Sequence, residues 1–466
     1  MNLIAVDIGS TWTKAALFAR EEERVVCRRR SAVPTTTGKL SDGFDAVVED
    51  VRTGVDGPCP PIVCSSSAKG GLAVAAVGIV PDLTLKMAHR TALSAGARIE
   101  AVFSYELTSA DRAALETLAP DIILFTGGTD GGNTEFIKKN VAVLRELTIR
   151  PHIVFAGNRT MADFVSRELS DFPVVVAENI LPDLNTPNPE PARAAIREIF
   201  IGSITHGKGL DDVSRRTTGP VLPTPLVVYE YVKIISETVP GRREFCLVDI
   251  GGATTDVYST GGAGGLFGGA SSGAPPVVLK GPPEPAIRRT VEGDLGMRVS
   301  AAAVLAAREG FLRPLCSDDD DWTAFCAYAR SLPDRPDFVT SGDPEARWDR
   351  MLAAACLTGA IERHAGRAQT VYTSDGAVTL QSGINLQGTE LLLLSGGFLS
   401  SVEMPPFIPL MRCERLDSTG RAILLPASWQ IHRDAENTLT LFAGAARVWP
   451  EHAALSAPAS RYAEVV

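Results

Sequence analysis

The stretch Asp7-Ile8-Gly9-Ser10 recurs, 242 residues further along the chain, as Asp249-Ile250-Gly251-Gly252. An apolar run precedes the aspartate in both copies, at residues 3–6 and 245–248, and small or hydroxyl-bearing residues follow. Each copy then resumes as a second strand. The pattern predicts a strand, an aspartate, a glycine-rich tight turn and a second strand. Because each copy opens its own half of the chain, we expect two related domains.

The residue types in the two turns predict a phosphate site. Glycine lets backbone N–H groups come close to a phosphate, and hydroxyl groups add further donors. A carboxylate at a strand end can hold a hydrated Mg²⁺ beside that phosphate. Two matched turns therefore predict a nucleotide clamped between two related halves, with Asp7 on one side and Asp249 on the other.

The composition sets limits on the class of protein. The chain has 466 residues, of which 45% are hydrophobic and 21% charged, so two to four domains with a sizeable core are expected. The formal net charge is −10 and no dense basic stripe occurs. This charge argues against nucleic acid or an anionic membrane surface as a partner.

The sequence contains no apolar stretch of the ~18 residues that a membrane span requires. Asp7 and Lys14 interrupt the apolar start of the chain, so a signal peptide is not expected and a cytoplasmic location is predicted. The eight cysteines form no CxxC pair, and the six histidines form no HxH or HxxxH pair. Neither a disulfide framework nor a metal centre built on these residues is expected.

A βαβ pattern dominates the middle of the first half. Continuous apolar strands alternate with helices, which predicts a parallel sheet covered on both faces. The glycine-rich turn at residues 126–132 follows one of these strands and is either a ligand site or part of a region that meets a partner. The expected strands are 121–125, 152–156 and 174–176, and the expected helices are 134–146 and 161–169.

We predict a division into three parts. Residues 1–240 form a first domain that includes an inserted α/β region at about 62–240, residues 241–440 form a second domain, and residues 441–466 form a C-terminal helix and tail. Within the second domain, residues 260–276 are expected to form a flexible, glycine-rich loop. Residues 292–309 are expected to form an alanine-rich helix.

Three segments resemble known nucleotide motifs. The hairpins at 6–14 and 248–256 and the strand with glycines at 391–397 are similar, in order and spacing, to the two phosphate motifs and the adenosine motif of the actin/heat-shock-chaperone/sugar-kinase superfamily. Residues 293–298 resemble the helix start that leans over the nucleotide in that superfamily. The resemblance implies an α/β fold with two actin-like, ribonuclease H-like domains facing a nucleotide cleft, with an insertion in the first.

More narrowly, the chain resembles the glutamate mutase accessory family called MutL or GlmL, which is unrelated to the mismatch-repair protein of that short name. This resemblance implies an ATPase that serves an adenosylcobalamin-dependent mutase or aminomutase. The implied work is that of a reactivating chaperone, which uses ATP to open an inactivated mutase and release damaged cobalamin. The stretches that carry the resemblance are 64–72, 125–132, 178–182 and 290–298.

The resemblance and the residue chemistry together assign roles to the acidic residues. Asp7 and Asp249 are the predicted catalytic residues and Mg²⁺ ligands, and Asp249 either holds metal-bound water or polarises the attacking water. Asp256 is a third catalytic candidate, with a turn-capping aspartate as the alternative. Lys14 either reaches the β- and γ-phosphates or is an exposed strand lysine.

The remaining predicted contacts to ATP come from backbone and hydroxyl donors. Those residues are Gly9, Ser10, Thr11, Thr13 and Lys14 in the first hairpin, Gly251, Gly252, Thr254 and Thr255 in the second, Gly293 and Asp294 after it, and Ser395, Gly396 and Gly397 in the third motif.

Three alternatives stay open beside the reactivating ATPase. The first is a small-molecule kinase of the same superfamily, although no kinase signature lies between the phosphate motifs. The second is a nucleotide-dependent scaffold without catalysis. The third is a dehydratase activator, whose iron–sulfur cluster sits on paired cysteines that this sequence does not offer. The sequence leaves open whether a second copy of the chain or a small partner subunit takes part, and the DxHxxG cobalamin signature is absent.

Overall fold

The structure is a computed structural model that describes residues 1–36, 38–55, 57–67, 72–80, 85–184, 186–204, 210–261, 275–281, 284–340, 342–374 and 376–456. The chain divides into two compact units, one made of Met1–Ala68 and Val227–Val466 and the other of Lys69–Leu226. The loop expected at 260–276 lies mostly outside the described residues. The boundaries predicted at residues 240 and 440 stay a prediction, because a division into compact units does not test them.

The first sheet of unit 1 contains the first acidic hairpin. Strand β1 pairs with β2 in antiparallel register and with β4 in parallel register, and β2 pairs with β3, so these strands lie in the order β4-β1-β2-β3. Helix α1 covers this sheet with an apolar face that includes Phe44, Val47 and Val51. The bounds are β1 Asn2–Ile8, β2 Trp12–Glu21, β3 Arg24–Pro34, α1 Leu40–Arg52 and β4 Ile62–Ser66.

The second sheet of unit 1 repeats this plan around the second hairpin. Strand β11 pairs with β12 in antiparallel register and with β17 in parallel register, and the order is β14-β12-β11-β17-β19. The two sheets thus share the ribonuclease H-like strand order. The bounds are β11 Cys246–Ile250, β12 Thr255–Thr260, β14 Ile287–Glu292, β17 Leu391–Ser395 and β19 Gln430–Arg433. The predicted α/β class with two actin-like halves is confirmed.

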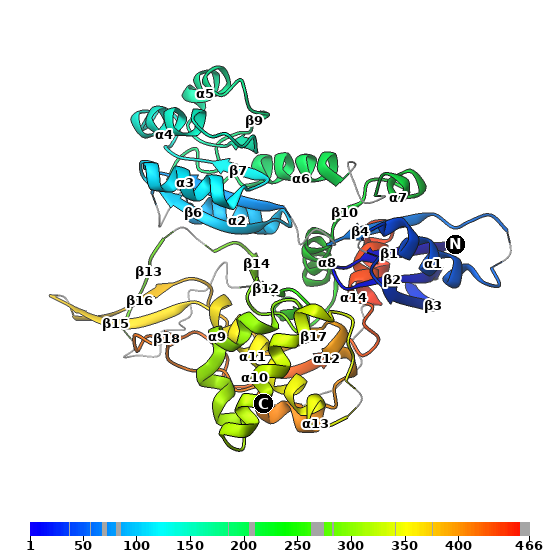
Figure 1. Cartoon of the computed structure of the whole chain (residues 1–466). Helices are drawn as coiled ribbons and strands as arrows, with labels where there is room; N and C mark the ends of the chain where they lie inside the picture. Colours follow the sequence, from blue (N-terminus) through cyan, green and yellow to red (C-terminus); the bar gives the residue numbers. More distant parts are fainter. Residues whose placement is uncertain are drawn as a thin grey trace. The chain divides into compact units, whose positions relative to one another are not determined.

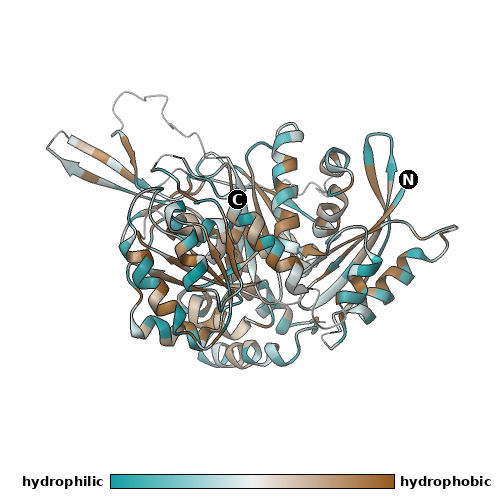
Figure 2. Ribbon diagram, turned by 90° about the horizontal axis from the view of Figure 1, so that it is seen from above, coloured by the Kyte–Doolittle hydropathy of each residue, from teal (hydrophilic) through white to brown (hydrophobic). Residues whose placement is uncertain are grey.

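Helices α9, α10 and α11 pack beside the second sheet (Figure 1). Helix α11 is buried on nearly every side, as expected for a helix that lies between a sheet and other helices. In Figure 2, many of the other helices show both hydrophilic and hydrophobic turns, which is the pattern of helices that cover a core. The bounds are α9 Ala301–Leu312, α10 Asp319–Ser331, α11 Glu345–His364, α12 Gly397–Ser401 and α13 Met404–Phe407.

A further sheet of unit 1 has the order β13-β16-β15-β18 and belongs to the second half of the chain. Its bounds are β13 Val277–Leu279, β15 Arg367–Thr373, β16 Gly376–Ser382 and β18 Ala422–Ile423. All three residues of β13 are exposed, and so is Tyr372 on β15. This sheet therefore contributes little to the core.

The helix that follows the second sheet packs on the first one. Helix α14 (Leu439–Ala446) contacts β1, and Gly444 permits this approach, because a Cβ atom there would lie 3.2 Å from the Cβ atom of Ala5. The Phe442 ring lies 4.7 Å from that of Phe18, measured between centroids. The chain then continues into α15 (Pro450–Leu455). Helix α14 is thus packed against the first sheet, although it follows the second sheet in the chain.

Unit 2 contains a fully parallel sheet in the order β6-β5-β7-β8-β9. Strand β7 is wholly buried, which explains its continuous apolar sequence. The parallel sheet that the βαβ pattern predicted is confirmed. The strands are β5 Ala73–Gly78, β6 Arg98–Ser104, β7 Ile122–Phe125, β8 His152–Phe155 and β9 Val174–Val176. The helices are α2 Lys86–Ser94, α3 Ser109–Leu118, α4 Glu135–Arg145, α5 Ala162–Glu168, α6 Glu190–Ile204 and α7 Leu210–Arg216. Strand β10 (Leu222–Pro223) and helix α8 (Thr224–Thr238) follow.

Candidate functional site

The two acidic hairpins close in the same way. The Gly9 N–H donates to the Trp12 carbonyl at 2.9 Å, and the Gly251 N–H donates to the Thr254 carbonyl at the same distance. The strand registers also agree, because Asp7 lies opposite Lys14 and Asp249 lies opposite Asp256. The hairpins are therefore equivalent residue by residue, which the sequence repeat alone implied only for the aspartates and glycines.

Both turns present unused backbone donors. The N–H groups of Ser10 and Thr11, and those of Gly252 and Ala253, make no hydrogen bond to any residue that the structure describes. Successive free N–H groups in a tight turn form a concave site with a positive partial charge, which suits an anion such as a phosphate. The chemistry predicted for these turns is thus available in the geometry.

The two turns touch each other. A Cβ atom at position 252 would lie 2.7 Å from the Cγ2 atom of Thr11, so only glycine fits there without displacing the threonine. This contact brings the donors of Ser10 and Thr11 near those of Gly252 and Ala253. A single anion of several oxygens can therefore be reached from both hairpins.

The first carboxylate is held by neighbours of its own sheet. Asp7 is 3% exposed, and the Ser65 hydroxyl on β4 donates to its Oδ1 atom at 3.1 Å. The Lys14 ammonium lies 3.8 Å from Oδ2 of Asp7. Lys14 is mostly buried and also donates to Oδ1 of Asn437 at 3.3 Å. It is therefore not the freely exposed strand lysine that we gave as its alternative interpretation.

The second carboxylate is differently placed. Asp249 accepts no hydrogen bond and forms no ion pair with any described residue. It keeps some solvent-accessible surface, yet burial raises the pKa of its carboxyl group to about 7, with Lys14 lowering it and the nearby Asp256, Asp7 and Asp434 raising it. A carboxylate without partners among other carboxylates favours a bound cation.

The equivalent serines of the two sheets behave differently. Ser65 lies beside Asp7 and Ser395 lies beside Asp249 in the parallel pairs β1–β4 and β11–β17. The Ser65 hydroxyl donates to its aspartate, whereas the Ser395 hydroxyl donates to Oδ2 of Asp434 at 3.2 Å. The serine that could satisfy Asp249 is therefore engaged elsewhere, which leaves Asp249 as the unpaired member of the two.

Asp256 is paired within its sheet. The Arg289 guanidinium on β14 donates to Oδ1 of Asp256 from Nε at 2.8 Å and from Nη2 at 2.6 Å, and the Thr254 hydroxyl lies 3.3 Å from Oδ2. Arg289 is buried, and its pKa is raised, with the nearby Asp256 carboxylate opposing the effect of burial. Asp256 thus has a structural role in the hairpin, beside which its catalytic role stays a prediction.

The hydroxyls of Thr13 and Thr255 face the interior. These two threonines occupy equivalent positions and are fully buried. The Thr13 hydroxyl lies 3.0 Å from that of Thr35, and the Thr255 hydroxyl donates to the Leu295 carbonyl at 2.6 Å. Both hydroxyls are therefore used inside the protein, unlike the N–H groups of the turns.

The third motif lies against the second hairpin. Gly396 follows β17 with φ +110°, and a Cβ atom there would lie 2.2 Å from the Ile250 carbonyl oxygen. Gly397 begins α12, and a Cβ atom there would meet only Nδ2 of Asn437, at 3.9 Å. Ser395, Gly396 and Gly397 are thus grouped at the end of β11, beside Asp249.

The segment after β14 supports the second turn and is not helical, so the helix expected at 292–309 is wrong at its start. Helix α9 begins at Ala301. The N–H groups of Met297, Arg298 and Val299 donate instead to the carbonyls of Gly251 and Gly252, and the Arg298 side chain is locked by a buried ion pair with Asp349 at 2.7 Å.

Gly293 and Asp294 lie earlier in this segment. The Arg363 guanidinium on α11 donates to both carboxylate oxygens of Asp294, at 2.6 and 2.8 Å, and also to Glu292 at 2.8 Å. The Arg363 side chain holds the pKa of Asp294 below its ordinary value. The Gly293 carbonyl accepts a hydrogen bond from the Ser300 hydroxyl at 2.8 Å. Asp294 is therefore fixed by the protein itself.

The glycine-rich turn of unit 2 is rigidly held. Asn179 donates to the Gly128 carbonyl at 3.0 Å and to Oδ1 of Asp130 at 2.9 Å, and the buried Asn158 accepts from the Gly131 N–H at 3.0 Å. A Cβ atom at Gly127 would lie 2.7 Å from Ile79. Packing within unit 2 therefore fixes the conformation of this turn, and its role as a ligand site or a partner region stays a prediction.

Four residues of the candidate site were not predicted from the sequence. Ser65, Arg289, Asp434 and Asn437 have their positions because of strand pairing and long-range contacts. Of these, Ser65 lies in a stretch that carried the family resemblance, and that position was the one available clue. The described residues contain no cluster of three or more His, Cys, Asp or Glu side chains that could hold a metal ion. In that same part of the chain, no helix combines the length and apolar character that crossing a membrane requires.

Two sheets of one strand order, joined at their glycine turns, define the chain as an α/β protein of the actin-like class. It matches the MutL protein family over residues 3–457. It is also 35% identical over 413 residues to Protein MutL of Clostridium tetanomorphum, an alignment that covers 86% of this chain and 87% of that protein. The chain belongs to the MutL protein family.

Two solved structures match this chain over nearly its full length. The activator of the 2-hydroxyisocaproyl-CoA dehydratase from Clostridium difficile with bound ADPNP is 10% identical, covers 97% of this chain and 96% of its own, and gives a TM-score of 0.30. The diol dehydratase-reactivating factor in nucleotide-free form is 9% identical, covers 96% and 99%, and gives a TM-score of 0.28.

The glycines of the third motif give a paired prediction. Gly396→Ala should lower the free energy of unfolding by about 2 kcal/mol or more, because the methyl group would meet the Ile250 carbonyl and the residue would keep a positive φ. Gly397→Ala is the matched control and should change it by less than about 0.5 kcal/mol. Urea unfolding of both variants measures this, and equal losses would contradict the packing described here.

The raised pKa of Asp249 predicts a pH dependence of stability. In the folded protein this carboxyl group keeps its proton up to about pH 7, whereas in the unfolded chain it loses it near 3.8. The contribution of this carboxyl group to the free energy of unfolding is therefore fully present below pH 4 and is lost as the pH rises towards 7. Asp249→Asn, which cannot ionise, should be more stable than the wild type at pH 8 by roughly 1 to 3 kcal/mol, after a discount for partial exposure.

The measurement is a series of unfolding curves between pH 5 and 8 on protein freed of nucleotide and divalent cations with EDTA. The stability gap between Asp249→Asn and the wild type should widen as the pH rises. The control is Asp320→Asn, an exposed aspartate on α10, for which the gap should stay flat. A gap at Asp249 that does not depend on pH would contradict the prediction.

Proposed function

We propose that this MutL-family protein is an Mg²⁺-dependent ATPase that acts as an accessory, reactivating chaperone for an adenosylcobalamin-dependent mutase of the glutamate mutase or aminomutase type. The observation that carries the nucleotide part is the contact between two equivalent turns whose N–H groups have no described partner, next to the unpaired Asp249. Family membership supports the mutase part.

The donor set fits a triphosphate with its metal. The free N–H groups of Ser10, Thr11, Gly252 and Ala253 supply anion donors. Mg²⁺ usually keeps several waters and uses one or two carboxylates together with phosphate oxygens, so the absence of a three-ligand protein cluster among the described residues is compatible with it. When bound, Mg²⁺ would neutralise phosphate charge.

The residues of the chain divide the work of hydrolysis. Asp7, fixed by Ser65, would hold the Mg²⁺, and Lys14 would place a positive charge beside the phosphate tail. Asp249, which has no described partner, would either hold the Mg²⁺ or polarise the attacking water. Such catalysis depends on positioning and charge rather than on covalent chemistry, which suits a site built of rigid turns.

The nucleoside part of ATP would be bound by the third motif. The turn at Ser395, Gly396 and Gly397 has little side-chain bulk, so its backbone can approach ribose and adenine. Gly293 and Asp294 would border the same region from the segment that supports the second turn.

The aspartates give the direct test of this proposal. Asp7→Asn and Asp249→Asn should each lower ATP hydrolysis at least about 100-fold, because each removes a charge that acts on the metal or the attacking water. Asp42→Asn changes an exposed residue of α1 that pairs with Lys39 on the surface, so it is the control and should keep wild-type hydrolysis.

The assay measures phosphate release from Mg²⁺–ATP without any added acceptor. Wild-type hydrolysis retained in both aspartate variants would refute the site. Turnover that requires a small-molecule acceptor would favour the kinase alternative, and tight ATP binding without turnover would favour the scaffold.

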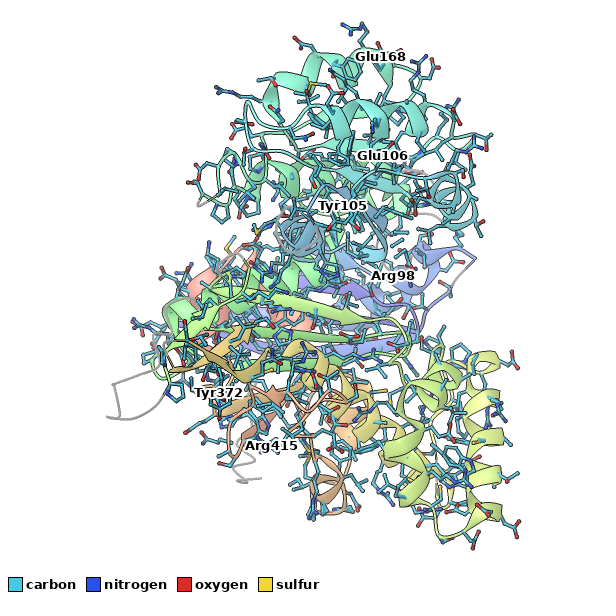
Figure 3. The ribbon with its side chains drawn as sticks, turned by 90° about the vertical axis from the view of Figure 1, so that its left-hand side faces the viewer. Arg98, Tyr105, Glu106, Glu168, Tyr372 and Arg415 are labelled. Atoms are coloured by element: carbon cyan, nitrogen blue, oxygen red, sulfur yellow. The ribbon has the colours of Figure 1, made fainter. Side chains whose placement is uncertain are left out.

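Unit 2 offers an exposed surface for a partner protein. Because the strands of its sheet are parallel, the residues at and just beyond their carboxyl ends gather at one edge. The exposed apolar residues Val80 and Tyr105 follow β5 and β6, and the exposed Val176 is the last residue of β9. Tyr105 and its neighbour Glu106 are labelled in Figure 3. Tyr105 is 54% exposed and has φ +65°, and the fully buried Asn140 holds it by accepting from the Leu107 N–H and donating to the Tyr105 carbonyl.

An exposed tyrosine on a rigid turn is typical of protein interfaces. Tyr105→Ser should therefore reduce the stimulation of ATP hydrolysis by a cognate mutase at least about tenfold and leave basal hydrolysis unchanged. Tyr372→Ser, an 86% exposed tyrosine on β15 (Figure 3), is the matched control and should leave both unchanged. Equal stimulation of both variants would exclude this edge of unit 2 as the mutase surface.

A further inference from the structure

The loop between β19 and α14 is locked to the end of β17 and to the start of α14. The Asp434 N–H donates to the Leu394 carbonyl at 2.8 Å, and the Asp434 carboxylate accepts from the Ser395 hydroxyl at 3.2 Å. The same carboxylate accepts from the N–H groups of Thr438 and Leu439, at 3.0 and 2.8 Å. Asp434 therefore ties the end of β17, where the third motif begins, to the first turn of α14.

Asn437 occupies a strained position in this loop. It has φ +52°, which is rare outside glycine but which asparagine tolerates better than most residues. Its own N–H donates to the Asp434 carbonyl at 3.1 Å, which holds this conformation. Residues in such conformations persist where the surroundings fix them, and they gather at functional sites.

The side chain of Asn437 is directed at the candidate site. Its Oδ1 atom accepts from the Lys14 ammonium at 3.3 Å, across 423 residues of sequence. Its Nδ2 atom lies on the side of Gly397. One amide therefore stands between the lysine of the first hairpin and the first residue of α12, next to the third motif.

The Lys14 ammonium needs such a partner. Lysine carries a point charge on a flexible stem with about 2 kcal/mol of rotamer entropy, so contacts that offset this entropy are needed to hold it in one position. The two described acceptors near Lys14 are Oδ2 of Asp7 at 3.8 Å and Oδ1 of Asn437 at 3.3 Å. The closer one is the amide. In the second hairpin, the equivalent residue Asp256 is fixed by Arg289 of its own sheet.

We propose that Asn437 is a positioning residue that directs the Lys14 ammonium towards the phosphate tail. The loop from Asp434 to Asn437 would make this orientation of Lys14 depend on whether a nucleoside occupies the third motif. The inference rests on the proposed ATPase function and adds regulation to the same site. Movement of the Ser395–Gly397 turn when a nucleoside binds would reach Lys14 through Asp434 and Asn437. Lys14 would then be correctly placed only when the nucleoside end is seated.

If Asn437 had a purely structural role, as a residue that merely tolerates the left-handed turn, its substitutions would have different effects from those expected of a positioning residue. Asn437→Gly keeps that conformation without strain and removes the amide, so a structural role predicts no effect on catalysis. Asn437→Asp keeps both the acceptor oxygen and a residue that tolerates the turn, so a positioning role predicts that it retains function.

The experiment is a double-mutant cycle of Asn437→Gly and Lys14→Met, with Asn437→Asp as the conservative variant. Asn437→Gly should lower kcat/KM for ATP about tenfold, corresponding to one displaced charged contact, and should leave the unfolding temperature nearly unchanged. In the Lys14→Met background the same change should cost nothing further, because its effect passes through the lysine. Asn437→Asp should retain at least half of the wild-type value.

A second readout needs no nucleotide. The full-length protein is treated with acetic anhydride and then digested, and mass spectrometry of its peptides follows acetylation at Lys14. This acetylation should be several-fold faster in Asn437→Gly than in the wild type. An undiminished kcat/KM with an unchanged acetylation rate, or an equal loss in the Lys14→Met background, would overturn the inference. Absence of hydrolysis in the wild type would instead count against the proposed function, and the acetylation rates would still decide whether Asn437 holds Lys14.

Discussion

The contact between the two glycine turns is the constraint on which the rest of unit 1 depends. Thr11 fills the space that a side chain at position 252 would need, so the side chain of the first turn packs against the backbone of the second. Close approach places four N–H groups without described partners near Asp249, which also has none. Polar groups that are removed from water without partners are costly, and a bound anion with its cation would remove that cost.

The two halves share a plan but differ in charge. Position 14 carries a lysine and the equivalent position 256 an aspartate, and each is neutralised by a different partner. Arg289 pairs with Asp256 inside the second sheet, whereas Lys14 turns towards Asp7 and Asn437. The first hairpin thus keeps its cation at the site, and the second keeps its aspartate at 249 free of described partners.

Part of this site could be read from the chain because its signals are local. Asp7, Asp249 and the glycines of both turns stand in a short repeated pattern, and strand, turn and strand follow from residue types within a few positions. The alanine-rich run at 292–309 shows the limit of such signals. Its helical propensity is overridden before Ala301, because Met297, Arg298 and Val299 hydrogen-bond to the second turn.

The sequence by itself determined the α/β class, the repeated hairpins and the parallel sheet of unit 2, because apolar periodicity and glycine placement act over short distances. Only the tertiary structure decided which side chains surround the carboxylates. Ser65, Asp434 and Asn437 come from strand ends and loops up to hundreds of residues from their partners. No local pattern encodes such a meeting, since it depends on which strands pair and on where α14 packs.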